Sequence, residues 1–95
     1  MRELDRTVHE PARLAILTVL AAAGDVEFRY LESATGLTCG NLSSHVSRLE
    51  AAGYVEVTKS FRGKVPVTSL RVTAEGRAAL EAYRRSPLDA LAPRR

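Results

Sequence analysis

Three glycines divide the first half of this 95-residue chain into segments whose composition is typical of short helices. Each segment ends just before a glycine: 12–23 before Gly24, 28–35 before Gly36, and 38–52 before Gly53. Glycine is favoured after the last turn of a helix, because it tolerates the left-handed backbone found there. Pro11 stands at the start of the first segment, where no backbone N–H is needed. The sequence therefore predicts three short helices, with Asp25 and Val26 as a plain connection between the first two.

The second half of the chain changes to the pattern of a β-hairpin. Residues 54–58 alternate apolar and polar side chains, as a half-buried strand does, and 67–72 form a second predicted strand. Residues 61–64 are predicted to form the turn between these strands. Thr73 is expected to cap a last helix that runs to Arg85. The predicted fold is mainly α with a two-stranded β-hairpin, in the order α-α-α-β-β-α.

Length and composition indicate one globular domain. A chain of 95 residues leaves no room for a separate sensor or catalytic module, and a hydrophobic content of 45% argues against disorder. We expect the domain to span 1–86, with 87–95 as a flexible C-terminal tail. The longest apolar stretch, 14–23, has about half the length of a bilayer-spanning helix. Residues 1–6 lack the apolar core of a secretion signal, so the expected location is cytoplasmic, without a membrane partner.

The third predicted helix has an unusual outward face. Leu42, Val46 and Leu49 repeat at the spacing of a buried helical stripe. The positions pointing away from that stripe carry small or polar side chains or arginine: Gly40, Asn41, Ser43, Ser44, Ser47 and Arg48. Surface helices normally carry Glu and Lys at such positions because both are good helix formers, yet no acid precedes Glu50. This composition predicts a helix that approaches a partner closely.

Positive charge gathers in the same part of the chain. Residues 38–72 contain five Lys or Arg against two Glu, whereas residues 1–37 carry a net charge of −2. Three of the cations, Lys59, Arg62 and Lys64, fall within six residues around the predicted turn, where Gly63 permits close approach of the backbone. Such a segment can bind a polyanion through phosphate contacts, which fix position without reading sequence. Charge and helix face together favour a nucleic acid as the partner.

The order of the elements is that of a winged helix-turn-helix. Residues 35–38, Thr-Gly-Leu-Thr, have the length that a helix-turn-helix connection requires, and the hairpin after the third helix is the wing. The third helix is then expected to enter the major groove of DNA, where Asn41 and the serines offer donors and acceptors to base edges. Thr38 and the first backbone N–H groups of this helix would face a phosphate.

Four stretches are distinctive in order and spacing: HEPARLAILTVL, FRYLESATGLTCGNLSSHVSRLEAAGYVEV, KSFRGKVPVT and LRVTAEGRAALEAY. Through them the chain resembles a family of small bacterial and archaeal winged-helix regulators related to the MarR and ArsR types. The resemblance implies a transcriptional regulator, more often a repressor, that binds a pseudo-palindromic double-stranded DNA operator as a homodimer through its N- and C-terminal helices. Segment 12–23 is apolar nearly all round, which agrees with cover from a second subunit. The family's base-facing positions correspond to Thr38, Asn41, Ser43, Ser44 and Arg48, and its basic wing to Lys59, Arg62 and Lys64.

Other functions have less support. The main alternative is a winged-helix module that binds a protein instead of DNA, against which the acid-free helix face speaks. An enzyme is not expected, because Ser44 and His45 are adjacent in sequence and do not face each other on a helix. We expect no cofactor and no metal site, since His9, His45 and Cys39 lack a ligand spacing and the cysteine-rich metal motif of ArsR-type sensors is absent. A small-molecule effector stays open, with no polar cluster to identify it.

Three single residues allow two interpretations each. His45, beside the buried stripe, is interpreted as a half-buried histidine bonded to backbone, with a phosphate contact as the alternative. Arg13 is interpreted as the partner of an acid, Glu10 or Glu32, and alternatively of a phosphate. Cys39 is interpreted as an innocuous small residue, with a redox switch as the alternative.

Overall fold

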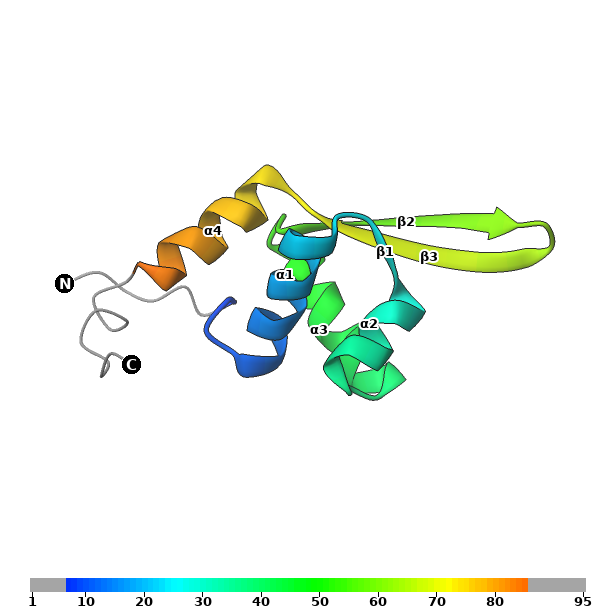
Figure 1. Ribbon diagram of the computed structural model, residues 1–95, viewed down its shortest axis with the longest axis horizontal. Coiled ribbons are helices and arrows are strands. Elements are labelled where there is room, and N and C mark those ends of the chain that lie inside the picture. Colours follow the sequence, from blue (N-terminus) through cyan, green and yellow to red (C-terminus); the bar gives the residue numbers. More distant parts are fainter. Residues whose placement is uncertain (1–6, 86–95) are drawn as a thin grey trace.

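The computed structural model describes residues 7–85 and confirms a fold of four helices with a small antiparallel sheet (Figure 1). In chain order the elements are α1 (Pro11–Ala23), β1 (Val26–Glu27), α2 (Phe28–Thr35), α3 (Cys39–Ala51), β2 (Val55–Arg62), β3 (Val65–Val72) and α4 (Ala74–Arg84). The ends of the four helices lie within one residue of their predicted positions. Residues 1–6 and 86–95, which include the predicted tail over 87–95, lie outside the described residues.

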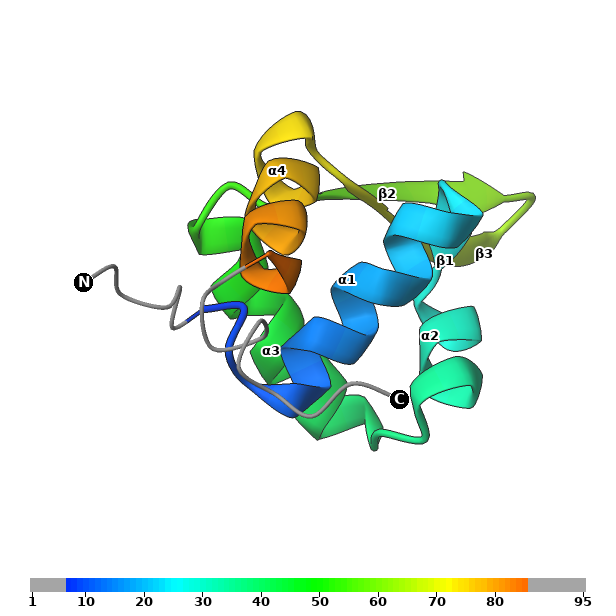
Figure 2. The same ribbon diagram turned by 60° about the vertical axis from the view of Figure 1, so that its left-hand side comes forward.

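Helix α1 forms the centre of the helical layer. It contacts α2, α3, α4 and β3, and Figure 2 shows it between α4 and α2. Its side chains Ile16, Leu17 and Leu20 are fully buried. They share one core with the predicted stripe of α3, Leu42, Val46 and Leu49. Burying one such side chain contributes about 1.5–3 kcal/mol, so this packing holds α3 against α1 and turns its polar face outward.

The sheet differs from the predicted hairpin in two ways. Val26 and Glu27, expected to be a plain connection, form the short strand β1, which pairs with Leu70 and Ser69 of β3. The sheet therefore has three strands in the order β1-β3-β2. The hairpin is also longer than predicted, since pairing continues to Arg62 and Val65 and leaves only Gly63 and Lys64 in the turn. Alternation of apolar residues could not show this extension, because the outer half of the hairpin has no core to face.

The base of the hairpin is joined to α4 by a network around Thr73. The Thr73 hydroxyl accepts a hydrogen bond from the Gly76 N–H (3.0 Å), which confirms the predicted cap, and donates one to the Gly53 carbonyl (2.6 Å). The Thr73 N–H donates to the Tyr54 carbonyl (3.0 Å). Gly76 packs so closely that a Cβ placed there would lie 2.1 Å from the Tyr54 oxygen. This contact sets the position of α4 beside the sheet.

None of the helices described between residues 7 and 85 has the length and hydropathy needed to cross a membrane.

Candidate nucleic-acid interface

The connection between α2 and α3 is closed by local hydrogen bonds. Gly36 adopts the left-handed conformation (φ 75°) and its N–H donates to the Glu32 carbonyl (2.9 Å), which ends α2. The Thr38 hydroxyl accepts a hydrogen bond from the Asn41 N–H (3.2 Å) and so caps α3, as predicted. Leu37, between them, packs partly buried against the core. The three residues of this connection therefore set the angle at which α3 leaves α2.

The predicted residues of α3 all lie on the surface. Thr38, Asn41, Ser43, Ser44 and Arg48 are exposed, whereas the apolar stripe on the other side of the helix is buried. No part of the described chain covers this face. A helix with exposed, short polar side chains is suited to fit into a groove, because its backbone can come close to the partner.

The exposed face of α3 has two distinct flanks. Ser43, Ser47 and Glu50 line a hollow that opens toward the hairpin. Arg48 lies at a second, shallower depression with Arg13 and Thr7, near the start of α1. The sequence placed Ser43 and Arg48 on one polar face, and the structure shows that they border opposite sides of it.

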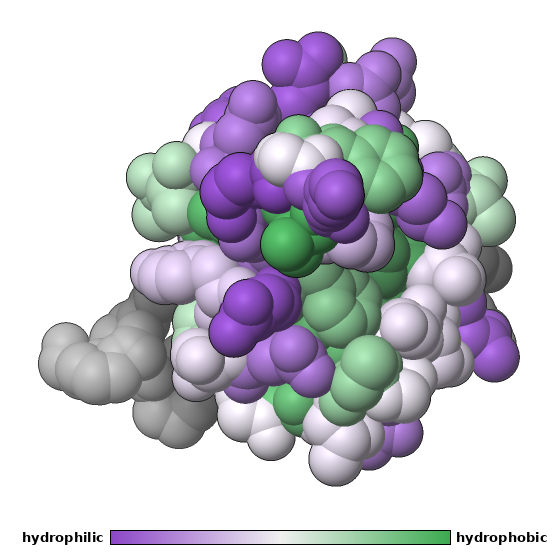
Figure 3. Space-filling view, turned by 90° about the vertical axis from the view of Figure 1, so that its right-hand side faces the viewer, coloured by the Kyte–Doolittle hydropathy of each residue, from purple (hydrophilic) through white to green (hydrophobic). Residues whose placement is uncertain are grey.

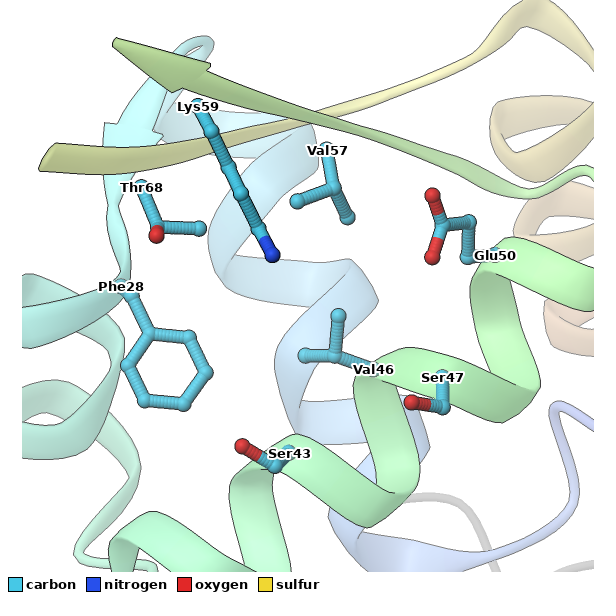
Figure 4. Close-up of a pocket in the computed structure, with 8 residues that line it drawn as sticks. All are labelled: Phe28, Ser43, Val46, Ser47, Glu50, Val57, Lys59 and Thr68. Atoms are coloured by element: carbon cyan, nitrogen blue, oxygen red, sulfur yellow. The ribbon is translucent and has the colours of Figure 1, made fainter.

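The hollow between α3 and the hairpin has a volume of about 550 Å³ and mixed chemistry. Phe28, Val46 and Val57 give it an apolar floor, and Lys59 extends from β2 into it (Figure 4). Its remaining lining is Ser43, Ser47, Glu50 and Thr68. A concave surface that joins a polar helix to a basic strand can accommodate the sugar-phosphate backbone of a nucleic acid between the two elements.

The three predicted wing cations do not form one cluster. Lys64 lies in the two-residue turn, whereas Lys59 pairs with Thr68 well inside the ladder. Arg62 belongs to β2, and its guanidinium forms an ion pair with the Glu27 carboxylate. Side chains alternate between the two faces of a strand, so Lys59 and Arg62 point to opposite faces of the hairpin. The prediction of a four-residue turn over 61–64 was wrong, because the ladder continues through residues 61 and 62.

His45 and Arg13 connect α3 to the start of α1. The Arg13 guanidinium donates to the Thr7 carbonyl (2.7 Å) and to the His45 Nδ1 (3.2 Å). The expected backbone partner of His45 and the expected carboxylate partner of Arg13 are replaced by this contact, although the Glu10 carboxylate also lies 3.9 Å from the His45 Nδ1. Glu10 caps α1 instead, and hydrogen bonds from the backbone N–H groups of Arg13 and Ala12 lower the pKa of its carboxyl.

The remaining candidate residues lie apart from this surface or make no cluster. His9 hydrogen-bonds with the Tyr83 hydroxyl (2.8 Å), which joins the start of the described chain to α4. Cys39 is exposed at the first position of α3. Residues 7–85 contain no group of three or more His, Cys, Asp or Glu side chains that could hold a metal ion.

Several residues near the interface were not among the predicted site residues, and Ser47, Thr68 and Glu27 are three of them. Ser47 lines the hollow, and its place on the outward helix face was visible in the sequence. Thr68 enters the hollow only because it pairs with Lys59, and Glu27 reaches Arg62 across 35 positions of sequence. Strand register decides both of these placements, and the register cannot be predicted from a local sequence pattern.

Comparison with known proteins identifies a family and a relative. A family described as the winged helix DNA-binding domain matches residues 12–88. An uncharacterised protein of Methanocaldococcus jannaschii is 40% identical over 72 residues, which are 75% of this chain and 77% of that protein.

The solved structures that share the fold include one from Pyrococcus horikoshii and one from Bacillus cereus. A transcriptional regulator homologue from Pyrococcus horikoshii has a TM-score of 0.80 at 27% identity, over 94% of this chain and 91% of that one. A MarR-like transcription regulator from Bacillus cereus has a TM-score of 0.72 at 21% identity, over 93% and 66% of the two chains.

Proposed function

The chain belongs to the winged helix DNA-binding domain family and is a DNA-binding regulator, not an enzyme. We propose that it is a sequence-specific repressor of transcription that acts as a homodimer. One observation carries this proposal. The exposed, polar face of α3 and the basic hairpin border the same hollow, whose one acidic lining residue among those described is Glu50, near the C-terminal end of α3. Double-stranded DNA offers a major groove that admits a helix and, beside it, a phosphate backbone that attracts cations.

In the proposed complex, α3 lies in the major groove and the hairpin lies on the adjacent backbone or minor groove. Asn41 and Ser44 contact base edges, because their side chains both donate and accept hydrogen bonds. Thr38 and the first N–H groups of α3 face a phosphate. The other proposed DNA contacts are Ser43 and Arg48 on α3, and Lys59, Arg62, Gly63 and Lys64 on the hairpin.

The proposed dimer forms through the N- and C-terminal helices. Ala15, Thr18 and Ala22 are exposed along α1, at the spacing of one helix edge, and α4 packs beside α1 (Figure 2). Small side chains on such an edge allow a second helix to approach closely. Two-fold symmetry then predicts a pseudo-palindromic operator whose half-sites lie one helical turn, ~34 Å, apart.

Selection of bound duplexes from a random pool tests this function. We expect an enriched sequence with inverted half-sites, and a mass in solution of twice the 10.3 kDa of one chain. Replacing Asn41 and Ser44 by alanine should reduce the preference for the selected duplex over a random one by about tenfold or more, because base contacts carry discrimination. Failure to bind any duplex at low salt would refute the proposal, and binding without enrichment would refute sequence specificity.

A further inference from the structure

Phe61 is the most exposed large apolar side chain among the described residues. It is 72% exposed, compared with 58% for Val65 and 53% for Tyr30. It lies in β2 one residue pair from the tip of the hairpin, opposite Pro66, which is also exposed. An isolated apolar residue on a surface needs no explanation, but an aromatic ring and a proline ring paired on a projecting hairpin make a continuous apolar edge.

This apolar edge faces the same side as the hollow beside α3. Side chains two apart on a strand share a face, so Phe61 points to the side of Lys59 and Val57. Lys59, Val57 and Thr68 line the hollow (Figure 4). Phe61 and Pro66 therefore extend the wall of the hollow outward to the tip. Figure 3, which looks toward this end of the molecule, shows hydrophobic surface among hydrophilic side chains there.

The charges near this apolar edge indicate which kind of partner it binds. No acidic residue occurs between Glu56 and Glu75. Of the nearby cations, Lys59 shares the face of Phe61 and Lys64 lies in the turn, whereas Arg62 points to the opposite face. The partner must therefore combine negative charge with apolar surface. The minor groove of duplex DNA has this combination, since deoxyribose forms its walls and phosphates form its rims, and apolar side chains insert there between base steps.

The shape of the hairpin agrees with this partner. From the pair Val57–Leu70, where the core ends, the ladder continues for five residues to Arg62–Val65, which extends the hairpin by about 17 Å (Figure 1). The two-residue turn at Gly63 and Lys64 keeps the tip narrow. A minor groove about 6 Å wide admits such a tip more readily than the full width of a two-stranded ribbon.

We propose that Phe61, supported by Pro66 opposite, is an apolar contact that inserts into the minor groove and bends the duplex. This inference rests on the proposed DNA-binding function and assigns to the wing a role beyond its charges. The contact neutralises no phosphate, so it contributes affinity without contributing to the salt dependence of binding.

The test compares Phe61→Ala with Val65→Ala. Val65 is exposed on the opposite face of the same hairpin, next to the turn, and is the matched control. We expect Phe61→Ala to raise Kd for the selected duplex about tenfold, as expected for partial loss of aromatic burial, and to leave the slope of log K against log salt unchanged. End-to-end energy transfer across a labelled duplex should show less bending with Phe61→Ala. Val65→Ala should match the wild type in all three measurements, and Phe61→Leu should keep most of the affinity.

The outcomes separate this inference from the proposed function. If the wild type binds no duplex, the DNA-binding function itself fails. If the wild type binds and Phe61→Ala binds and bends DNA equally well, the function stands and the inference is overturned. A third outcome concerns vesicles that contain phosphatidylserine. If the wild type binds such vesicles and Phe61→Ala does not, while both bind DNA equally well, the inference is overturned in favour of an anionic membrane. Matching thermal unfolding of all three variants and the wild type excludes misfolding as the cause.

Discussion

The base and the tip of the β2–β3 hairpin belong to one continuous ladder and have opposite surroundings. At the base, Val55 pairs with Val72 and Val57 pairs with Leu70, and Val55 and Leu70 are buried against the helices. At the tip, Arg62 pairs with Val65 and both are exposed. Backbone hydrogen bonds continue along both halves, but only the base gains the free energy of apolar burial. We therefore expect the base to determine stability and the tip to determine binding.

Leu70→Ala should produce the largest change, a loss of stability at the base of the hairpin. Leu70 is 1% exposed and pairs with both Val26 and Val57, so truncation leaves a cavity where the two halves of the sheet meet. We expect the free energy of unfolding, measured by urea denaturation, to fall by about 2–5 kcal/mol. The control at the tip, Val65→Ala, should change it by less than about 0.5 kcal/mol. Equal losses at the two positions would show that base and tip do not differ in this way.

Gly76→Ala should destabilise the base of the hairpin, because Gly76 of α4 packs against it. The added Cβ would overlap the Tyr54 carbonyl, a backbone atom that cannot move aside without shifting β2. We expect a loss of about 1–3 kcal/mol in urea denaturation. Gly40→Ala in α3 is the matched control, because nothing lies within 4 Å of its added Cβ, and it should stabilise the fold by up to about 1 kcal/mol. A neutral Gly76→Ala would mean that α4 is free to move away from the hairpin.

Replacing Lys59 and Lys64 together by alanine should leave stability unchanged and weaken binding to every duplex. Both residues are exposed. At near-physiological salt we expect about tenfold weaker binding, and a salt slope smaller by about 0.9 for each phosphate that is no longer neutralised. Fluorescence anisotropy over a series of salt concentrations measures both quantities. The Lys→Arg double variant keeps the charges and should bind like the wild type. An unchanged slope in the alanine variant would remove the lysines from the proposed interface.

Glu27→Gln should have the smallest effect of these variants, and it should strengthen DNA binding instead of weakening it. Its carboxylate pairs with Arg62 across the sheet, and exposed ion pairs of this kind contribute little to stability. Releasing Arg62 should make it available to a phosphate and lower Kd about twofold. Glu56→Gln is the control, because it removes the same charge from a pair with Arg71 at the base (2.9 Å). Equal gains in both variants would indicate net charge alone as the cause.

Sequence patterns predicted the helical part of this molecule almost completely. Proline and glycine marked the ends of α1 and α2, and the repeat of Leu42, Val46 and Leu49 identified the buried side of α3. Thr38 and Thr73 were correctly predicted as caps, because a cap bonds to an N–H only three residues away. The outer ladder of the hairpin was not predicted, since no core imposes alternation there and Phe61 and Arg62 directly precede the turn glycine, Gly63.

The sequence by itself determined the helix order, the identity of the polar face of α3 and the concentration of cations near the hairpin. All three depend on residues close together in the chain, where periodicity and composition are sufficient evidence.

Only the tertiary structure decided the contacts across the fold. Arg13 with His45, Glu27 with Arg62, and His9 with Tyr83 are separated by 32, 35 and 74 positions. A pattern shows which side of an element is apolar but not which element will lie opposite its polar side. That choice follows from packing and strand register, which depend on the whole chain at once.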